Sequence, residues 1–185
     1  APALHAANLL QVRELCSNYG DLSEIWFDMG SLTLQQSKEI RDLVKSLQPD
    51  CMIGGRIGNG QGDFIVSPDN VNGDMKYETP WQSVNSIYDN TWGYRSWQPI
   101  GNAKAKAVEH LGKMIKTVYL GGNYMLNIGP KGDGSIQDFE KQVIEYIGSW
   151  IDAGMQKQYM IPDHCRVATN PGEDLPITMA ISMLM

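Results

Sequence analysis

The amino-acid sequence predicts an α/β fold in which helices cover a parallel sheet, and three observations support this expectation. Short apolar runs alternate along the chain with longer segments whose apolar residues recur at helical spacing. A strand with one face exposed to solvent alternates apolar and polar residues, whereas these runs are continuously apolar. Continuous apolar runs are typical of parallel strands buried on both faces. Glycine and proline bound most of the runs, as expected for strands that end in turns. This alternation predicts a parallel sheet with helices packed against it.

The individual elements follow from the same periodicity. The predicted helices span residues 4–19, 33–47, 103–119 and 139–151. The predicted strands span residues 24–27, 51–56, 83–87 and 123–129. Residues 57–80 carry repeated glycines and prolines and are predicted to form one long loop, which in a compact domain usually serves function.

Composition excludes several classes of function. The 185 residues are 42% hydrophobic and 19% charged, which suits one globular core. A net charge of −6 without a basic cluster argues against nucleic-acid or anionic-membrane partners, and no apolar run reaches the ~20 residues of a membrane span. Residues 1–8 show no charged leader with an apolar segment, so no signal peptide is expected there.

No cofactor or metal is expected. The three cysteines, Cys16, Cys51 and Cys165, are too far apart for a metal-binding motif, and the first two read as small buried hydrophobic residues. The glycine-rich run 58–62 is not followed by the Lys-Ser/Thr pair of a phosphate-binding loop.

The strand Ile25-Trp26-Phe27 ends abruptly in Asp28, which is the most informative feature of the chain. A carboxylate at the end of an apolar strand loses solvation, so it is expected to be used or paired. Two interpretations remain open from this segment alone. Asp28 is either a catalytic carboxylate at the carboxyl end of a parallel strand, or the cap of the helix that begins near Leu32.

Six short segments are informative together. They are 26–28 (Trp-Phe-Asp), 47–50 (Leu-Gln-Pro-Asp), 55–59 (Gly-Arg-Ile-Gly-Asn), 62–64 (Gly-Asp-Phe), 90–94 (Asn-Thr-Trp-Gly-Tyr) and 121–130 (Gly-Gly-Asn-Tyr-Met-Leu-Asn-Ile-Gly-Pro). In their order and spacing they resemble the alpha-L-fucosidases of glycoside hydrolase family 29. The resemblance implies a (β/α)8-type TIM-like barrel, present here only in part as about strands four to eight. It implies a partial barrel catalytic domain over residues 1–160 and a C-terminal tail of uncertain structure over residues 161–185.

The resemblance also implies retaining removal of terminal alpha-L-fucose, with Asp28 at the nucleophile position. The acid/base lies in the loop after Arg56, where the register favours Asp69 and leaves Glu78 as the alternative. Arg56 is expected to hydrogen-bond the sugar and to hold the nucleophile ionised. Trp26 and Trp92 are expected to pack against the apolar face of fucose, or else to belong to the core.

Further expectations concern partners and location. The resemblance implies a fucosylated oligosaccharide or glycoconjugate as partner and a periplasmic, secreted or lysosomal location. The first half of the barrel, with the family's substrate-binding histidines, has no counterpart here, since His5, His110 and His164 match none of them. The alternative function is therefore an inactive fragment or a non-catalytic carbohydrate-binding remnant. Half a barrel has open sheet edges, which favour self-association. A weaker alternative is a relative that cleaves another deoxy or galacto-configured sugar.

Overall fold

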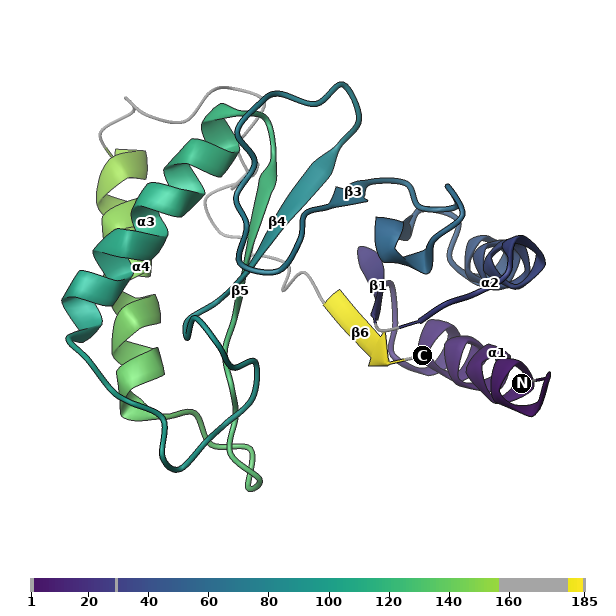
Figure 1. Cartoon of the computed structure of the whole chain (residues 1–185), viewed down its shortest axis with the longest axis horizontal. Helices are drawn as coiled ribbons and strands as arrows, with labels where there is room; N and C mark the ends of the chain where they lie inside the picture. Colours follow the sequence, from purple (N-terminus) through teal and green to yellow (C-terminus); the bar gives the residue numbers. More distant parts are fainter. Residues whose placement is uncertain (1, 29, 157–179, 185) are drawn as a thin grey trace. The chain divides into compact units, whose positions relative to one another are not determined.

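The computed structural model describes residues 2–28, 30–156 and 180–184 (Figure 1). Helices and strands alternate along most of the chain, so the expected α/β class is confirmed. Residues 24–28 pair in parallel with residues 52–53 and 180–184, and residues 81–86 pair in parallel with residues 123–127. The chain divides into two compact units, residues 1–66 with 174–185, and residues 67–173. Each unit is described by itself.

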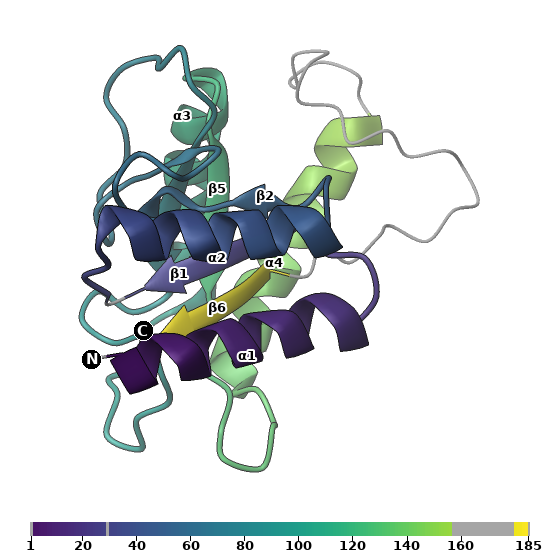
Figure 2. The same ribbon diagram turned by 90° about the vertical axis from the view of Figure 1, so that its right-hand side faces the viewer.

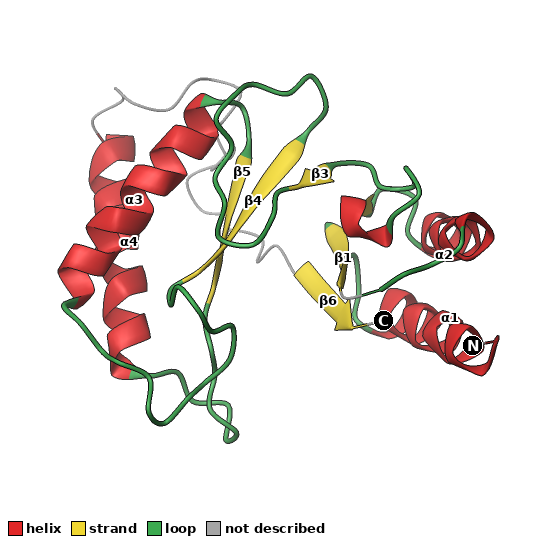
Figure 3. Cartoon of the chain, in the orientation of Figure 1, coloured by secondary structure: helices red, strands yellow, loops and turns green. Residues whose placement is uncertain are grey.

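The first unit contains a three-stranded parallel sheet with β1 (Glu24–Asp28) at its centre. On one side β1 pairs with the short strand β2 (Met52–Ile53), in register Ile25 with Ile53. On the other side it pairs along its whole length with β6 (Ala180–Leu184) (Figure 3). The strand that carries Asp28 is therefore hydrogen-bonded on both edges.

Two helices cover one face of this sheet, α1 (Pro2–Asn18) and α2 (Leu34–Leu47). They pack against each other, and Figure 2 shows both on the same side of β1 and β6. Successive side chains of a strand point to opposite faces, so Ile25 and Phe27 enter the core beneath these helices while Trp26 and Asp28 point the other way. The core consists of Val12, Cys16, Leu22, Ile25, Phe27, Ile40, Val44, Cys51, Ile53 and Ile57.

Local chemistry determines where α2 begins and ends. Thr33 is its N-cap: its hydroxyl accepts from the Gln36 amide, and the Gln36 side chain accepts in return from the Thr33 amide at 2.9 Å. Asp28 does not cap this helix, so the capping interpretation is wrong. At the other end Gln48 accepts from the Leu22 amide and donates to the Cys16 carbonyl, which ties the end of α2 to the end of α1.

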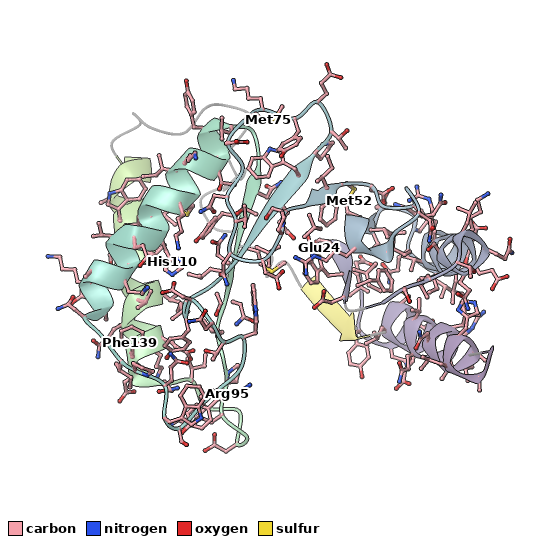
Figure 4. The ribbon with its side chains drawn as sticks, viewed as in Figure 1. Glu24, Met52, Met75, Arg95, His110 and Phe139 are labelled. Atoms are coloured by element: carbon pink, nitrogen blue, oxygen red, sulfur yellow. The ribbon has the colours of Figure 1, made fainter. Side chains whose placement is uncertain are left out.

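The second unit contains the parallel pair β4 (Trp81–Ser86) and β5 (Asn123–Asn127). The helices α3 (Ala103–Tyr119) and α4 (Asp138–Gln156) pack side by side. Their core joins Ile87 and Tyr88 from the end of β4 with side chains of both helices. His110 of α3, labelled in Figure 4, is buried and lies 2.7 Å from the Tyr124 hydroxyl of β5.

Trp81 is the largest buried side chain of the second unit, and two glycines make room for it. A Cβ on Gly73 would lie 2.6 Å from its ring, and one on Gly122 would lie 2.3 Å from it. Gly122 follows Gly121, whose φ of +78° allows the tight turn from α3 into β5. These glycines are therefore required by packing as well as by turn geometry.

Two segments differ from the sequence-based expectations. Residues 51–56 were expected to form one strand, but β2 ends at Ile53 and Arg56 lies in a 3₁₀ turn, η1 (Gly55–Ile57). The loop predicted for residues 57–80 contains the short strand β3 (Ile65–Val66). Of the tail expected over residues 161–185, residues 161–179 and 185 lie outside the described residues, while residues 180–184 form β6. Among the helices of the described chain, none combines the length and hydrophobicity that a bilayer crossing requires.

Candidate active site

The end of β1 carries a compact cluster of a carboxylate, a guanidinium and an indole. Arg56 Nη1 donates to Asp28 Oδ1 at 2.9 Å, and the two side chains are 22% and 29% exposed. The guanidinium carbon of Arg56 also lies 4.6 Å from the ring centroid of Trp26, which is within cation–π range. A charged pair that stays partly accessible can still contact a ligand, whereas Trp26 itself is only 6% exposed.

Close backbone packing places Arg56 in this cluster. A Cβ on Gly62 would lie 2.5 Å from the Gly55 Cα, and one on Gly55 would lie 2.6 Å from the Phe64 carbonyl oxygen. The segment 62–64 therefore lies directly against the start of η1, where only glycines fit. This contact turns the chain immediately after β2, which explains why Arg56 lies on a 3₁₀ turn instead of extending the strand.

Asp63 holds the same region together. Its carboxylate accepts from Arg41 at 2.8 Å, from Lys45 at 2.9 Å and from the Ile53 amide at 3.0 Å. Burial alone would raise the pKa of this carboxyl, but the three hydrogen bonds outweigh burial and lower the pKa below its usual value. Asp63 thus links α2 to the end of β2 as an ionised group.

The turn after η1 is fixed by a second polar network. Ser37, fully buried on α2, donates to the Ile57 carbonyl at 2.9 Å. Asn59 has a positive φ of 54° and donates to the Ser37 hydroxyl and to the Leu32 carbonyl, both at 2.9 Å. The glycine-rich run 58–62 is therefore a scaffold turn, consistent with setting aside a phosphate-binding role.

Asp69 lies in the second unit, in a turn that runs along β4. The Asn70 amide donates to the Val84 carbonyl at 2.9 Å, and Asn70 Oδ1 accepts from the Ser86 amide at 2.8 Å. Asn70 Nδ2 donates to the Asp89 carbonyl at 3.1 Å. The exposed Asp69 is thereby presented beside the carboxyl end of β4.

Glu78 lies at the opposite end of the same strand. It is exposed and precedes Trp81, the first residue of β4, by three positions. Tyr77, its neighbour, packs on Trp81 with ring centroids 5.4 Å apart. Met75 marks this end of the unit in Figure 4, and Arg95, in the loop that follows β4, marks the other.

Trp92 is half-buried in the segment after β4, and β5 holds its backbone. Asn127 Nδ2 donates to the Trp92 carbonyl at 2.7 Å, so the Asn127 amide satisfies a backbone group of this segment. Gly129 lies so close to this segment that an added Cβ would approach the Tyr94 nitrogen to 2.7 Å. The buried Glu140 in turn accepts from the Gly129 amide at 3.0 Å.

The structure thus joins three of the predicted site residues, Asp28, Arg56 and Trp26, in the first unit. Asp69, Glu78 and Trp92 belong to the second unit. Sequence reasoning missed Asn70 and Glu140, both of which position candidate residues, and only the Pro-Asp-Asn turn pattern at 68–70 pointed to the former. In the part of the chain that the structure describes, no group of three or more His, Cys, Asp or Glu residues could hold a metal ion.

Parts of this chain are similar in sequence to known alpha-L-fucosidases. Human tissue alpha-L-fucosidase is 33% identical over 79 residues, which are 43% of this chain and 17% of that protein. Plasma alpha-L-fucosidase from Pongo abelii is 30% identical over 168 residues, covering 82% of this chain and 34% of that protein. The chain therefore spans about a third or less of these relatives.

Solved structures of alpha-L-fucosidases are also similar to this chain. The alpha-L-fucosidase isoenzyme 1 from Paenibacillus thiaminolyticus superimposes with a TM-score of 0.71 at 26% identity, covering 84% of this chain and 40% of that one. The alpha-L-fucosidase AlfC from Lactobacillus casei, in complex with alpha-L-fucose, gives a TM-score of 0.64 at 29% identity, covering 80% and 45%. The alpha-L-fucosidase family model matches residues 5–155, so the chain belongs to the alpha-L-fucosidase family.

Proposed function

We propose that this chain carries the catalytic carboxylates of a retaining alpha-L-fucosidase that removes terminal alpha-L-fucose from glycoconjugates. The observation that carries the proposal is the Arg56–Asp28 ion pair at the carboxyl end of β1, where parallel α/β folds keep their functional groups. Family membership and the fucose bound in the related AlfC structure support the substrate class. A further AlfC structure holds Fuca(1,6)GlcNAc, which supports a fucosylated oligosaccharide as partner.

In the proposed reaction Asp28 is the nucleophile. Its carboxylate attacks the anomeric carbon as the bond to the leaving oxygen breaks, and Asp69 gives its proton to that oxygen. Water then attacks the anomeric carbon of the fucosyl-enzyme, its proton passes to Asp69, and the ester bond to Asp28 breaks. Arg56 donates to Asp28 and orients it, while Trp26 and Trp92 are proposed to line the fucose site.

Asp69 is favoured as acid/base because of its place on β4. It lies beside the carboxyl end of this strand, whereas the alternative, Glu78, precedes the amino end. The hydrogen bonds of Asn70 also hold the turn of Asp69 at a defined position, which general acid catalysis requires.

The remaining expectations accompany this proposal. Residues 1–160 are proposed to form the partial (β/α)8-type barrel of the catalytic domain, about strands four to eight, followed by the tail 161–185. The similarity to a plasma alpha-L-fucosidase supports an extracytoplasmic location. The edge strands β2 and β6 of the first sheet are the proposed route for self-association.

The stereochemistry of azide rescue tests the two roles separately. Asp28→Ala should lower hydrolysis of 4-nitrophenyl alpha-L-fucoside by about three orders of magnitude or more, and azide should restore turnover with β-fucosyl azide as product. Asp69→Ala should instead yield α-fucosyl azide, because azide then attacks the fucosyl-enzyme. The same α-product from Glu78→Ala would reassign the acid/base. Asp50→Ala, at an exposed site away from the cluster, is the matched control.

Near-normal turnover of Asp28→Ala would refute the nucleophile assignment. The alternative, a carbohydrate-binding remnant, is supported by the limited span of the chain relative to the fucosidases it matches. A folded wild-type chain that binds alpha-L-fucose in ligand-observed NMR but releases no nitrophenol would favour that alternative.

A further inference from the structure

A pocket of about 390 Å³ lies at the carboxyl end of β4, and neither Asp28 nor Asp69 lines it. The segment after β4 forms one wall through Asp89, Trp97 and Gln98, and the first turns of α3 and α4 form the other through Lys106 and Phe139. Its volume is within the range of small-molecule sites. Figure 4 shows Phe139 at the same end of the unit as Arg95, opposite Met75.

Trp97 gives this pocket a wide apolar surface that remains accessible. Its side chain is 68% exposed, although it lies in a turn closed by the Gln98 amide donating to the Arg95 carbonyl at 3.0 Å. The Thr91 hydroxyl donates to Gln98 Oε1 at 2.7 Å, and the Thr91 carbonyl accepts from the Ser86 hydroxyl at the end of β4. The turn is therefore anchored to the strand, so the indole is presented at a defined place instead of folding into the core.

The polar groups around Trp97 suit a neutral, hydroxyl-rich ligand. Asp89 on one wall and Lys106 on the other bring opposite charges within 3.9 Å of each other, so the pocket does not favour an ion of either sign. Gln98 Oε1 accepts from the Thr91 hydroxyl, and the amide nitrogen of the same side chain is a hydrogen-bond donor. An accessible indole beside a few such groups is the combination that binds a sugar ring, whose CH face stacks while its hydroxyls hydrogen-bond.

A hydrogen bond connects the pocket to the proposed acid/base. Asn70 holds the turn of Asp69 and donates to the carbonyl of Asp89, a residue that lines the pocket. A general acid must reach the glycosidic oxygen, so the sugar that leaves lies on the same side as this acid. We infer that the pocket receives the leaving-group sugar, a hexopyranose, with Trp97 as its stacking surface; this inference rests on the proposed function and assigns a subsite to it.

Binding can be measured without turnover. In saturation-transfer NMR the 185-residue chain should bind methyl β-D-glucopyranoside and methyl β-D-galactopyranoside, and Trp97→Ala should weaken that binding roughly three- to tenfold. Trp150→Ala removes another exposed indole of the second unit, one that does not line the pocket, and should bind like the wild type. Equal binding by Trp97→Ala and wild type, or no binding of either sugar, would overturn the inference.

Kinetics separate this subsite from the chemistry. Alpha-L-fucosyl fluoride has no leaving-group sugar, whereas an alpha-L-fucosyl hexose disaccharide has one. Trp97→Ala should lower the ratio of kcat/KM for the disaccharide to that for the fluoride severalfold, while Trp150→Ala should keep the wild-type ratio. An unchanged ratio in an active Trp97→Ala enzyme would overturn the subsite alone. If the wild type hydrolyses neither substrate, the proposed function and the role of the pocket as a leaving-group site are both overturned. Sugar binding in NMR that depends on Trp97 would then show sugar recognition without hydrolysis.

Discussion

Asn70 is the residue through which local structure should control both the stability of the second unit and the placement of Asp69. It adopts a positive φ of 58°, and its side chain accepts from the Ser86 amide and donates to the Asp89 carbonyl. Three substitutions separate these contributions. Asn70→Ala removes both hydrogen bonds and strains the left-handed backbone, Asn70→Gly removes the bonds without that strain, and Asn70→Asp keeps the acceptor for Ser86.

The magnitudes follow from burial. Ser86 is 2% exposed, so leaving its amide without an acceptor costs about 1–3 kcal/mol. The bond to the Asp89 carbonyl lies near the surface and contributes about 0.5–1 kcal/mol. A left-handed alanine costs about 1 kcal/mol more than glycine or asparagine. We therefore expect losses of about 3 kcal/mol for Asn70→Ala, about 2 for Asn70→Gly and about 1 for Asn70→Asp.

Urea unfolding of the three variants, with hydrogen exchange of the Ser86 amide, measures this order directly. Ser86 should lose protection in the alanine and glycine variants and retain it in Asn70→Asp. In an active enzyme Asn70→Ala should also lower kcat, because Asn70, next to Asp69, loses its two side-chain hydrogen bonds and keeps only the backbone bond to Val84. Equal stability of Asn70→Ala and wild type, or an Asn70→Asp variant as unstable as Asn70→Ala, would refute the reasoning.

Two further predictions concern packing and charge. Gly122→Ala places a Cβ 2.3 Å from the buried Trp81 and should destabilise the protein by about 3 kcal/mol or more. Its control is Gly112→Ala on α3, where an added Cβ meets nothing within 4 Å, and this change should stabilise the protein by about 0.5–1 kcal/mol. Thermal melts followed by circular dichroism measure both effects. A Gly122→Ala protein that melts with the wild type would contradict the packing argument. Asp63→Asn should lower the free energy of unfolding by about 2–3 kcal/mol at pH 7, since two cations lose their anion. Folding lowers the pKa of the Asp63 carboxyl, so its contribution to the free energy of unfolding is complete at pH values above the unfolded-state pKa. That contribution is lost as the pH falls through the lower folded-state pKa. The urea unfolding curves of wild type and variant should therefore converge as the pH falls below about 4. A difference that stays constant down to pH 3, or an equal effect of Asp50→Asn at an exposed position, would count against the ion-pair argument.

The helices and most strands could be predicted from the sequence because their signals are local. Apolar spacing places α2 to within one residue of its start at Leu34. The same reasoning located Asp28 at a strand end, since an apolar run that stops at a carboxylate is visible in four residues. The four residues do not exclude a capping role for Asp28, because that role is excluded by the capping box of Thr33 and Gln36 further along the chain.

The errors and omissions concern contacts between segments far apart in the chain. Arg56 was expected at a strand end because residues 51–56 are compatible with a strand by composition. The turn at Gly55 arises from Gly62 and Phe64, whose close approach no local pattern reveals. The sequence pattern around Glu140 is compatible with a charged residue on the exposed face of an amphipathic helix. In the structure Glu140 is fully buried and accepts from the Gly129 amide, eleven positions earlier in the chain.

Several residues of the motifs that carry the family resemblance hydrogen-bond backbone groups elsewhere in the chain. Gln48 binds backbone groups at the end of α1, and Asp63 binds the Ile53 amide beside the turn that carries Arg56. Asn127 holds the backbone of Trp92, 35 positions earlier in the chain. Each of these residues satisfies backbone groups of another segment of the chain. A match to the motifs therefore identifies a scaffold, and the chemistry must be argued from the few charged groups at strand ends, foremost the Asp28–Arg56 pair.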